Sequence, residues 1–207
     1  MIRGALLVED GAFAPLLICA NMQRDAAPAA PAGENAQFAL GRCAALLVLW
    51  RERRWTVAHL RRIARPSWFD PHLPQPEWIE GFRPRPGELT FEHALPSAFS
   101  STRFAEYVRN VRPSPNFLVG YSLDETILAT AMDGYHRGHQ FHVVEDAVLC
   151  MPRAKPSGSL AAHQKTVLHI LQVFGERVRS EAVIMPFTTG GNSSTLGAYS
   201  RGSRGSQ

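Results

Sequence analysis

Residues 117–138, FLVGYSLDETILATAMDGYHRG, decide the fold, because they place a short apolar strand, a tight turn and a helix in immediate succession. The apolar run 117–119 follows a proline-containing loop and precedes a glycine, which is typical of a buried strand. Apolar residues then recur at helical spacing from Ile127 to Met132. Thr126 is therefore expected in the first turn of the helix, where backbone amides and the helix dipole face the carboxyl end of the sheet. In α/β folds, ligands bind at such a junction.

Strand and helix patterns alternate along the rest of the chain, on both sides of this segment. Further strands are expected at residues 15–22, 55–60, 140–146 and 180–185, with a short one at the start of 87–110. Helices are expected at residues 36–53 and 160–178 and at the end of 87–110. This alternation predicts an α/β fold with a doubly wound, mostly parallel, six-stranded sheet and helices on both faces.

Length and composition suit a single domain. A chain of 207 residues that is 45% hydrophobic can bury a sizeable core, which we expect within residues 1–187. Residues 188–207 are rich in glycine and serine with few apolar anchors, so we expect a disordered tail. The proline- and aromatic-rich region 65–87 is expected to be irregular and to line a pocket, although a small satellite core or an oligomer contact would explain its aromatic residues equally well.

Charge and cysteine content argue against several classes of protein. The net charge of +4 is modest and lacks the clustering and reading motif of a nucleic-acid-binding protein. Some arginines do cluster around a strand candidate, and we interpret them as a solvated rim: Arg51, Arg53, Arg54, Arg61, Arg62 and Arg65. Cys19, Cys43 and Cys150 have no paired spacing, which fits free thiols in a reducing compartment. No apolar run reaches membrane-spanning length, so we expect a cytoplasmic protein that binds neither nucleic acid nor membrane.

The segment GYSLDETILATAMDGYHRGHQFHVVEDAV, residues 120–148, resembles the isochorismatase-like hydrolases, which include nicotinamidases, carbamoylsarcosine amidases and isochorismatases proper. The positions that match the family pattern here are Gly120, Leu123, Thr126, Ile127, Thr130, Ala131, Asp133, Gly138, Asp146 and Ala147. The likeness extends to NMQRD near the end of the first strand and to the run from Ser97 to Phe99 with Thr102. It implies a three-layer, Rossmann-like fold with strand order 3-2-1-4-5-6, and a homo-oligomer.

The family's catalytic residues are an Asp, a Lys and a Cys, and the matching positions of this sequence hold Asn21, His93 and Thr126. The neighbouring family residues keep their places, among them Gln23 and Ser97, so a shifted alignment does not explain the three replacements. The resemblance therefore implies a conserved framework whose chemistry has changed.

No metal or other cofactor is predicted. Asp70 and His72 superficially match the metal ligands of nicotinamidases, but the second histidine of that set is missing. A helix end, a turn and a strand separate His136, His139 and His142, so their imidazoles need not converge. We interpret His59 as a strand-end residue that caps a carbonyl group rather than as a metal ligand.

Two functional hypotheses remain. The family mechanism does not fit, because Asn21 cannot accept a proton and a threonine hydroxyl is far harder to ionise than a thiol of pKa ~8.5. In the catalytic hypothesis, His93 is the general base, Thr126 is the nucleophile or positions a water, and Asn21 orients the imidazole. In the other hypothesis, the protein is a pseudoenzyme that binds a small molecule or serves as an oligomeric scaffold.

The resemblance implies an amide, an ester or an isochorismate-like molecule as the ligand in both cases. We expect the following residues to contact it: Gln23, Trp68, Phe69, Phe99, Tyr121 and Ser122.

Overall fold

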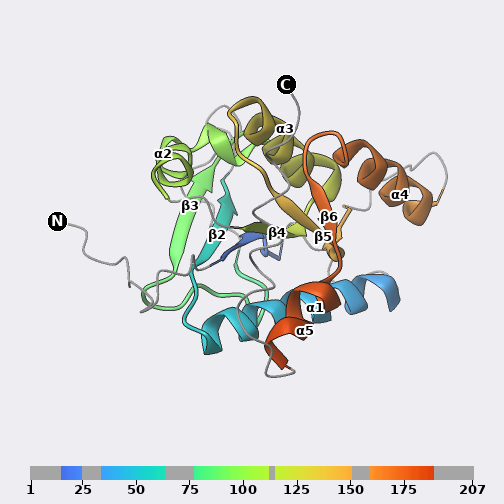
Figure 1. The fold of residues 1–207 in the computed structure, drawn as a ribbon, viewed down its shortest axis with the longest axis horizontal. Helices are drawn as coiled ribbons and strands as arrows, with labels where there is room; N and C mark the ends of the chain where they lie inside the picture. Colours follow the sequence, from blue (N-terminus) through green and yellow to red (C-terminus); the bar gives the residue numbers. More distant parts are fainter. Residues whose placement is uncertain (1–14, 25–33, 64–76, 112–114, 151–158, 189–207) are drawn as a thin grey trace.

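The computed structural model describes residues 15–24, 34–63, 77–111, 115–150 and 159–188 (Figure 1). The strands are β1 Leu16–Ala20, β2 Val57–Arg62, β3 Leu89–His93, β4 Asn116–Tyr121, β5 His142–Leu149 and β6 Glu176–Val178. The helices are α1 Glu34–Glu52, α2 Thr102–Asn110, α3 Leu128–His136, α4 Leu160–Leu171 and α5 Ser180–Thr188. Two short helical turns, η2 Ala98–Ser100 and η3 Leu123–Ile127, precede α2 and α3. Trp68, Phe69, Asp70, His72, Arg65 and the tail from residue 189 lie outside the described residues.

All six strands are parallel and follow the order β3-β2-β1-β4-β5-β6, which confirms the predicted doubly wound sheet and its strand order. The last predicted strand was wrong, because residues 180–185 begin helix α5 and the strand is the short β6 before it. The carboxylate of Asp146 accepts hydrogen bonds from the backbone N–H and the hydroxyl of Ser180, at 2.8 and 2.7 Å, and so caps this helix. A short apolar run does not distinguish a strand from a buried helix by itself.

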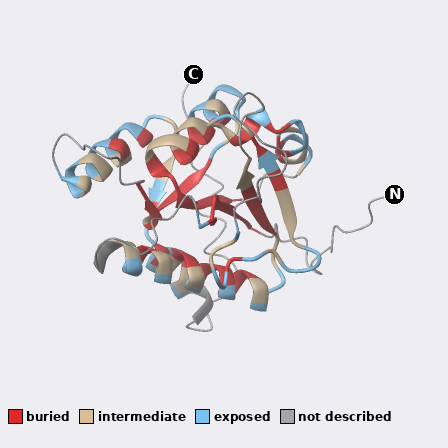
Figure 2. Cartoon of the chain, turned by 180° about the vertical axis from the view of Figure 1, so that it is seen from behind, coloured by how far each residue is buried: buried red, intermediate tan, exposed pale blue. Residues whose placement is uncertain are grey.

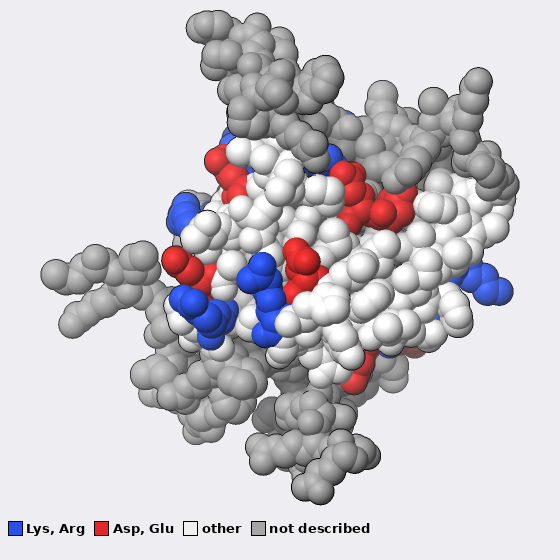
Figure 3. Space-filling view, turned by 90° about the horizontal axis from the view of Figure 1, so that it is seen from above, with Lys and Arg blue, Asp and Glu red and all other residues white. Residues whose placement is uncertain are grey.

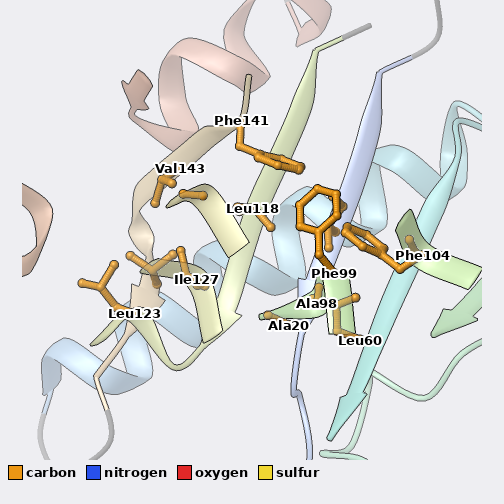
Figure 4. Close-up of a cluster of buried hydrophobic side chains, with 14 of the residues drawn as sticks. Ala20, Leu60, Ala98, Phe99, Phe104, Leu118, Leu123, Ile127, Phe141 and Val143 are labelled. Carbon is orange, nitrogen blue, oxygen red and sulfur yellow. The ribbon is translucent and has the colours of Figure 1, made fainter. Parts of the chain in front are cut away.

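Successive residues of each strand face opposite sides of the sheet, and helices cover both sides (Figures 1 and 2). Leu16 and Ile18 of β1 pack into the hydrophobic cluster under α2, α3 and α4. Leu17 and Cys19 pack into the cluster under α1 and α5. Figure 4 shows the first cluster, in which Phe99 and Phe104 lie on one side of Leu118 and Ile127 lies on the other.

Gly120 allows the ends of β1 and β4 to approach closely. Its φ of 102° lies in the region that favours glycine. A Cβ atom at this position would lie 2.4 Å from the carbonyl oxygen of Ala20 and 2.8 Å from Sδ of Met22. The segments that follow these two strands are therefore held side by side.

A buried ion-pair cluster on the α1 side corrects two predictions. Nε and Nη2 of Arg51 donate to the carboxylate of Glu88 at 2.7 and 3.0 Å, and both side chains are about one-tenth exposed (10% and 11%). Arg51 therefore does not belong to a solvated rim. His59 caps no carbonyl, because its Nε2 lies 2.8 Å from the same carboxylate and its ring is fully buried. The pKa of Glu88 is lowered to about 2, since the hydrogen bonds from Arg51, the Arg85 backbone and His59 outweigh the opposing effect of burial.

Side chains of both charges lie on the face of the molecule that is formed on the side of α2, α3 and α4. In Figure 3, Lys and Arg side chains lie beside Asp and Glu side chains, and no single-sign field covers the described part of this face. Among the helices of the described residues, none combines the length and apolarity needed to cross a membrane.

Candidate functional site

Three neighbouring segments place polar side chains at the carboxyl edge of the sheet. Asn21 directly follows β1, His93 is the last residue of β3, and Thr126 lies in the η3 turn after β4. Because all the strands are parallel, their carboxyl ends meet at one edge, where α/β proteins bind their ligands. Asn21 has a φ of 47°, a left-handed conformation that asparagine tolerates better than most residues.

The three side chains form one buried chain of hydrogen bonds. Nδ2 of Asn21 donates to Oγ1 of Thr126 at 2.9 Å, and Oδ1 of Asn21 lies 2.8 Å from Nε2 of His93. Nδ1 of His93 lies 2.7 Å from the carbonyl oxygen of Leu95. Asn21 and His93 are 2% exposed and Thr126 is fully buried. The structure thus brings together the three positions that the sequence singled out.

The protonation of His93 decides the direction of these hydrogen bonds. Burial lowers the pKa of His93, the carbonyl of Leu95 opposes this effect, and the nearby charge of Arg62 adds to it, so the imidazole is neutral at neutral pH. The Leu95 carbonyl can only accept, which puts the single proton on Nδ1 and leaves Nε2 as an acceptor.

When His93 is neutral, its Nε2 requires a hydrogen-bond donor. The Asn21 carboxamide supplies one after a 180° flip, which exchanges the positions of Oδ1 and Nδ2. In that orientation the amide nitrogen faces His93, and the amide oxygen accepts the proton of the Thr126 hydroxyl. The orientation with Oδ1 against Nε2 belongs to the doubly protonated imidazolium. Protonation of His93 and the direction of the Thr126 hydrogen bond are therefore linked through Asn21.

The order of the contacts differs from the Cys, His, Asn arrangement expected for a catalytic His93. In that arrangement the base contacts the nucleophile and the asparagine lies behind the base. Here Asn21 lies between His93 and Thr126. A carboxamide does not take up a proton at neutral pH, so the resting structure offers no direct proton transfer from Thr126 to His93.

An ion pair lies beside this hydrogen-bonded chain. The guanidinium of Arg62, at the end of β2, donates to both carboxylate oxygens of Glu125 at 2.6 and 2.8 Å. The two side chains are 40% and 30% exposed, and both charges act on the pKa of His93, Arg62 lowering it and Glu125 raising it. Arg62 thus forms a bidentate ion pair while its side chain stays partly exposed. Two signals in the sequence could have revealed this pair: Glu125 directly precedes Thr126, and Arg62 ends the strand between those of Asn21 and His93.

The other residues expected to contact a ligand are held by the protein itself. Both ends of the Gln23 carboxamide bond to the backbone of Arg62, at 2.8 and 3.2 Å, which ties the end of β1 to that of β2. The Phe99 ring packs in the core against Phe104 and Phe141. Tyr121 packs in the core on the opposite side of the sheet.

Ser122 and Thr130 have structural contacts around the η3 turn. The carbonyl oxygen of Ser122 accepts from the N–H of Ile127 at 3.0 Å, which closes the turn that carries Thr126. The hydroxyl of Thr130 accepts from the N–H of Ala98 at 3.0 Å and so joins α3 to η2. The matching family positions around Thr130 and Ala98 therefore support the framework of the site.

A large hollow of about 1050 Å³ lies elsewhere, between α1, α4 and β5. Its lining includes Phe38, Glu145, Cys150, Gln164 and Arg177. Its lining does not include the hydrogen-bonded side chains of Asn21, His93 and Thr126. The hydrogen-bond geometry, and not the size of the hollow, identifies the candidate site.

His136, His139 and His142 lie on different parts of the fold. His136 ends α3 and is exposed, His139 stacks against the ring of Phe99, and His142 is buried at the start of β5. They form no group of metal-ligand geometry within the described part of the chain.

Comparison with known proteins agrees with this architecture. The family model described as "Isochorismatase domain" matches residues 15–176. A protein of the isochorismatase family from Chromobacterium violaceum is similar in structure, with 23% identity, a TM-score of 0.73 and coverage of 86% of this chain and 95% of that one. An isochorismatase from Pseudomonas putida has 21% identity, a TM-score of 0.71 and coverage of 81% and 89%.

An amidase shares the same fold. The N-carbamoylsarcosine amidase from Thermoplasma acidophilum has 22% identity, a TM-score of 0.64 and coverage of 82% of this chain and 98% of that one. No curated protein matches the sequence.

Proposed function

The chain belongs to the isochorismatase domain family, and we propose that it is a hydrolase of this family that acts on a small amide, ester or isochorismate-like molecule beside Thr126. The observation that carries the proposal is the buried run of hydrogen bonds from Thr126 through Asn21 to His93, at the carboxyl ends of three parallel strands. Thr126 also lies in the first turn of a helix, where backbone amides can stabilise a carbonyl oxygen as it becomes negative.

The cysteine mechanism of related hydrolases is not part of this proposal. Thr126 offers a hydroxyl in place of a thiol, and Asn21 offers an amide in place of a carboxylate. His93 is the member of this trio that can accept a proton at neutral pH. In the proposed reaction, Thr126 attacks the carbonyl carbon, and His93 takes the hydroxyl proton and returns it to the leaving amine or alcohol. A water then hydrolyses the ester formed on Thr126, with His93 again as the base; alternatively, a water held by Thr126 attacks the carbonyl carbon directly.

That reaction needs the Asn21 carboxamide to move aside, because it separates the base from Thr126 in the resting structure. A positioned base typically supplies ~10²–10⁴-fold in rate, and this factor is lost whenever the carboxamide stays in place. We therefore expect slow turnover.

A second candidate function, ligand binding without turnover, is favoured by one observation. The Asn21 carboxamide satisfies both neighbours at once, so the chain of hydrogen bonds is complete without a substrate. Such a site can hold a small carbonyl compound and leave it unchanged.

A hydrolysis screen separates the two functions. The native protein is assayed on small amides, ureides, aryl esters and isochorismate, beside His93→Ala and the triple variant Asn21→Asp, His93→Lys, Thr126→Cys. His136→Ala removes an exposed histidine from α3 and is the matched control. Native turnover that is lost in His93→Ala and kept in His136→Ala supports the hydrolase. A silent native protein overturns it, and turnover gained only by the triple variant then assigns the site to binding.

We also propose a cellular compartment, an oligomeric state and a partner for the protein. Cys19, Cys43 and Cys150 are buried and form no disulfide within the described residues, which supports a reducing compartment such as the cytoplasm. We propose that the protein works as a homo-oligomer, built from the single domain within residues 1–187, and that its partner is a small molecule rather than nucleic acid or membrane. Light scattering at micromolar concentration tests the oligomer, and a monomeric mass contradicts it.

A further inference from the structure

A second group of reactive side chains lies at the carboxyl end of β5, apart from the hydrogen-bonded chain of Asn21. A carboxylate oxygen of Asp124, Sγ of Cys150 and a ring nitrogen of His163 all lie within 4.8 Å of one another. Asp124 belongs to η3, Cys150 directly follows β5, and His163 lies near the start of α4. Among the described residues, this is the one group of three His, Cys, Asp or Glu side chains with such convergence.

We propose that Asp124, Cys150 and His163 bind a divalent metal ion of the zinc class, with the fourth coordination position open to water or a small ligand. Zinc takes thiolate, imidazole and carboxylate ligands at 2.0–2.3 Å, which places tetrahedral ligand atoms roughly 3.5 Å apart. Nε2 of His163 and Oδ2 of Asp124 are already 3.2 Å apart. The three donor atoms lie within 4.8 Å of one another, so shifts of about 1 Å would bring all of them to the spacing of ligands around one zinc ion.

Two of the three proposed ligand side chains, Asp124 and Cys150, are buried, unlike the side chains of a cluster on the surface. The side chain of Asp124 is 4% exposed and Cys150 is 5% exposed, whereas the imidazole of His163 is 41% exposed. Buried carboxylates are found paired or coordinating metals, since an isolated buried charge is costly. Cys150 also lines the hollow between α1, α4 and β5, which gives an ion and a fourth ligand a route to the site.

The donor set selects the metal. One sulfur, one nitrogen and one oxygen suit Zn²⁺ and its spectroscopic substitute Co²⁺. Mg²⁺ and Ca²⁺ take oxygen ligands, so they are expected not to compete. Among the described residues, neither of the other two cysteines belongs to such a convergent group, and Sγ of Cys43 lies 2.9 Å from the carbonyl oxygen of Ala147.

The ion would connect three elements of the fold. Asp124 stands two residues before Thr126 in the same turn, so a bound ion would tie that turn to β5 and α4. At a zinc concentration ~100 times the dissociation constant, binding to the folded state should raise the melting temperature by about 5–10 °C. This inference does not depend on whether the Thr126 site hydrolyses anything.

The test uses the full chain, freed of metal by a chelator and titrated with Co²⁺ and with Zn²⁺. We expect a near-ultraviolet thiolate-to-cobalt band with the visible bands of a tetrahedral ion, and a rise in melting temperature with Zn²⁺ but not with Mg²⁺ or Ca²⁺. In Cys150→Ser and in His163→Gln, the zinc affinity should fall by more than about 100-fold, beyond the usual effect of losing a residue that only supports a ligand. His136→Gln, which changes an exposed histidine at the end of α3 that does not line the hollow, should bind like the native protein.

Three results would overturn the proposal. The first is the absence of both the cobalt band and the zinc-dependent rise in melting temperature in the native protein. The second is a cobalt band that persists in Cys150→Ser, which would assign it to Cys19 or Cys43. The third is unchanged zinc affinity in His163→Gln. This variant is expected to fold, because the His163 side chain is 41% exposed.

Discussion

The carboxamide of Asn21 links His93 to Thr126, because it hydrogen-bonds to both side chains, at 2.8 and 2.9 Å. The site is therefore a buried polar chain with the His93 imidazole, whose pKa burial lowers, at one end and the Thr126 hydroxyl at the other. Proton transfer and carboxamide orientation are coupled in such an arrangement, and the predictions about His93 follow from that coupling.

Replacing Asn21 by Asp should raise the pKa of His93, because a buried carboxylate beside the imidazole stabilises its charged form. In the native protein that pKa lies below 6.5, so His93 should titrate at lower pH than an exposed histidine. NMR titration of the His93 ring measures both values. Asn110→Asp, at the end of α2, is the control and should leave the titration unchanged. Identical His93 titrations in the native protein and Asn21→Asp would contradict the arrangement.

The ion pair beside the site should tune the same pKa in two directions. Arg62→Gln should raise the pKa of His93 and Glu125→Gln should lower it, since the two charges act on the imidazole with opposite sign. Both side chains are partly exposed, so each change should stay below about 0.5 pH unit. The same NMR titration tests this, and shifts of equal sign in the two variants would refute it.

Stability should fall as the pH drops below about 6.5, the pKa of an unfolded histidine. The folded protein holds His59 and His93 with lowered pKa values, so the unfolded chain binds more protons in that range. Urea unfolding at pH 7.5 and 5.5 measures the loss. His93→Gln should reduce the difference between the two pH values, by at most ~1.4 kcal/mol per pH unit of separation. His136→Gln serves as the exposed control, and an equal reduction there would count against a role for burial.

Glu88→Gln should destabilise the protein by about 1–3 kcal/mol at pH 7, because it weakens hydrogen bonds from Arg51 and His59 in a buried cluster. The pKa of Glu88 is lowered to about 2, so this contribution is present above about pH 4.5 and is lost as the pH falls towards 2. Urea unfolding at pH 7 and pH 3 should show the variant approaching the native protein at the lower pH. Glu92→Gln, whose contact with Arg61 is largely exposed, should cost less than about 1 kcal/mol.

Gly120→Ala should cost about 3 kcal/mol or prevent folding. The added Cβ would lie 2.4 Å from the Ala20 carbonyl oxygen, and the φ of 102° strains any residue with a Cβ. Gly41→Ala is the matched control, since its Cβ would contact nothing within 4 Å in helix α1. That change should stabilise the protein by about 0.5–1 kcal/mol. Thermal unfolding of the two variants compares them, and a Gly120→Ala protein as stable as the native one would disprove the close approach.

The sequence predicted the sheet because buried parallel strands are continuous apolar runs. The strand, turn and helix pattern indicated the place of Thr126, whereas Asn21 and His93 were identified through the family resemblance. It did not predict that Asn21 bonds to both His93 and Thr126, because strand patterns fix where a residue lies but not which side-chain atoms meet. Nor did it predict that Tyr121 faces the α1 side, since a shift by a single residue reverses the side on which a strand residue points. Residues 180–185 were assigned to a strand because their helix depends on a distant cap, Asp146.

The sequence also did not predict that Asp124, Cys150 and His163 lie close together, because they are far apart along the chain. Residues 124, 150 and 163 have no local spacing that resembles a zinc motif, and only the meeting of η3, β5 and α4 brings them together. Arg51 was assigned to the surface because an arginine near a strand usually is, whereas its partner Glu88 lies far away in the sequence.

The left-handed backbone of Asn21 bears on how such a site changes over generations. Asparagine and aspartate both adopt this conformation with little strain, whereas most other residues with a Cβ do not. Their codons differ by a single nucleotide, so this position can exchange a carboxylate for a carboxamide in one mutation without disturbing the fold around it. Lineages can therefore lose or regain a proton acceptor at this position repeatedly, while the backbone around it stays the same.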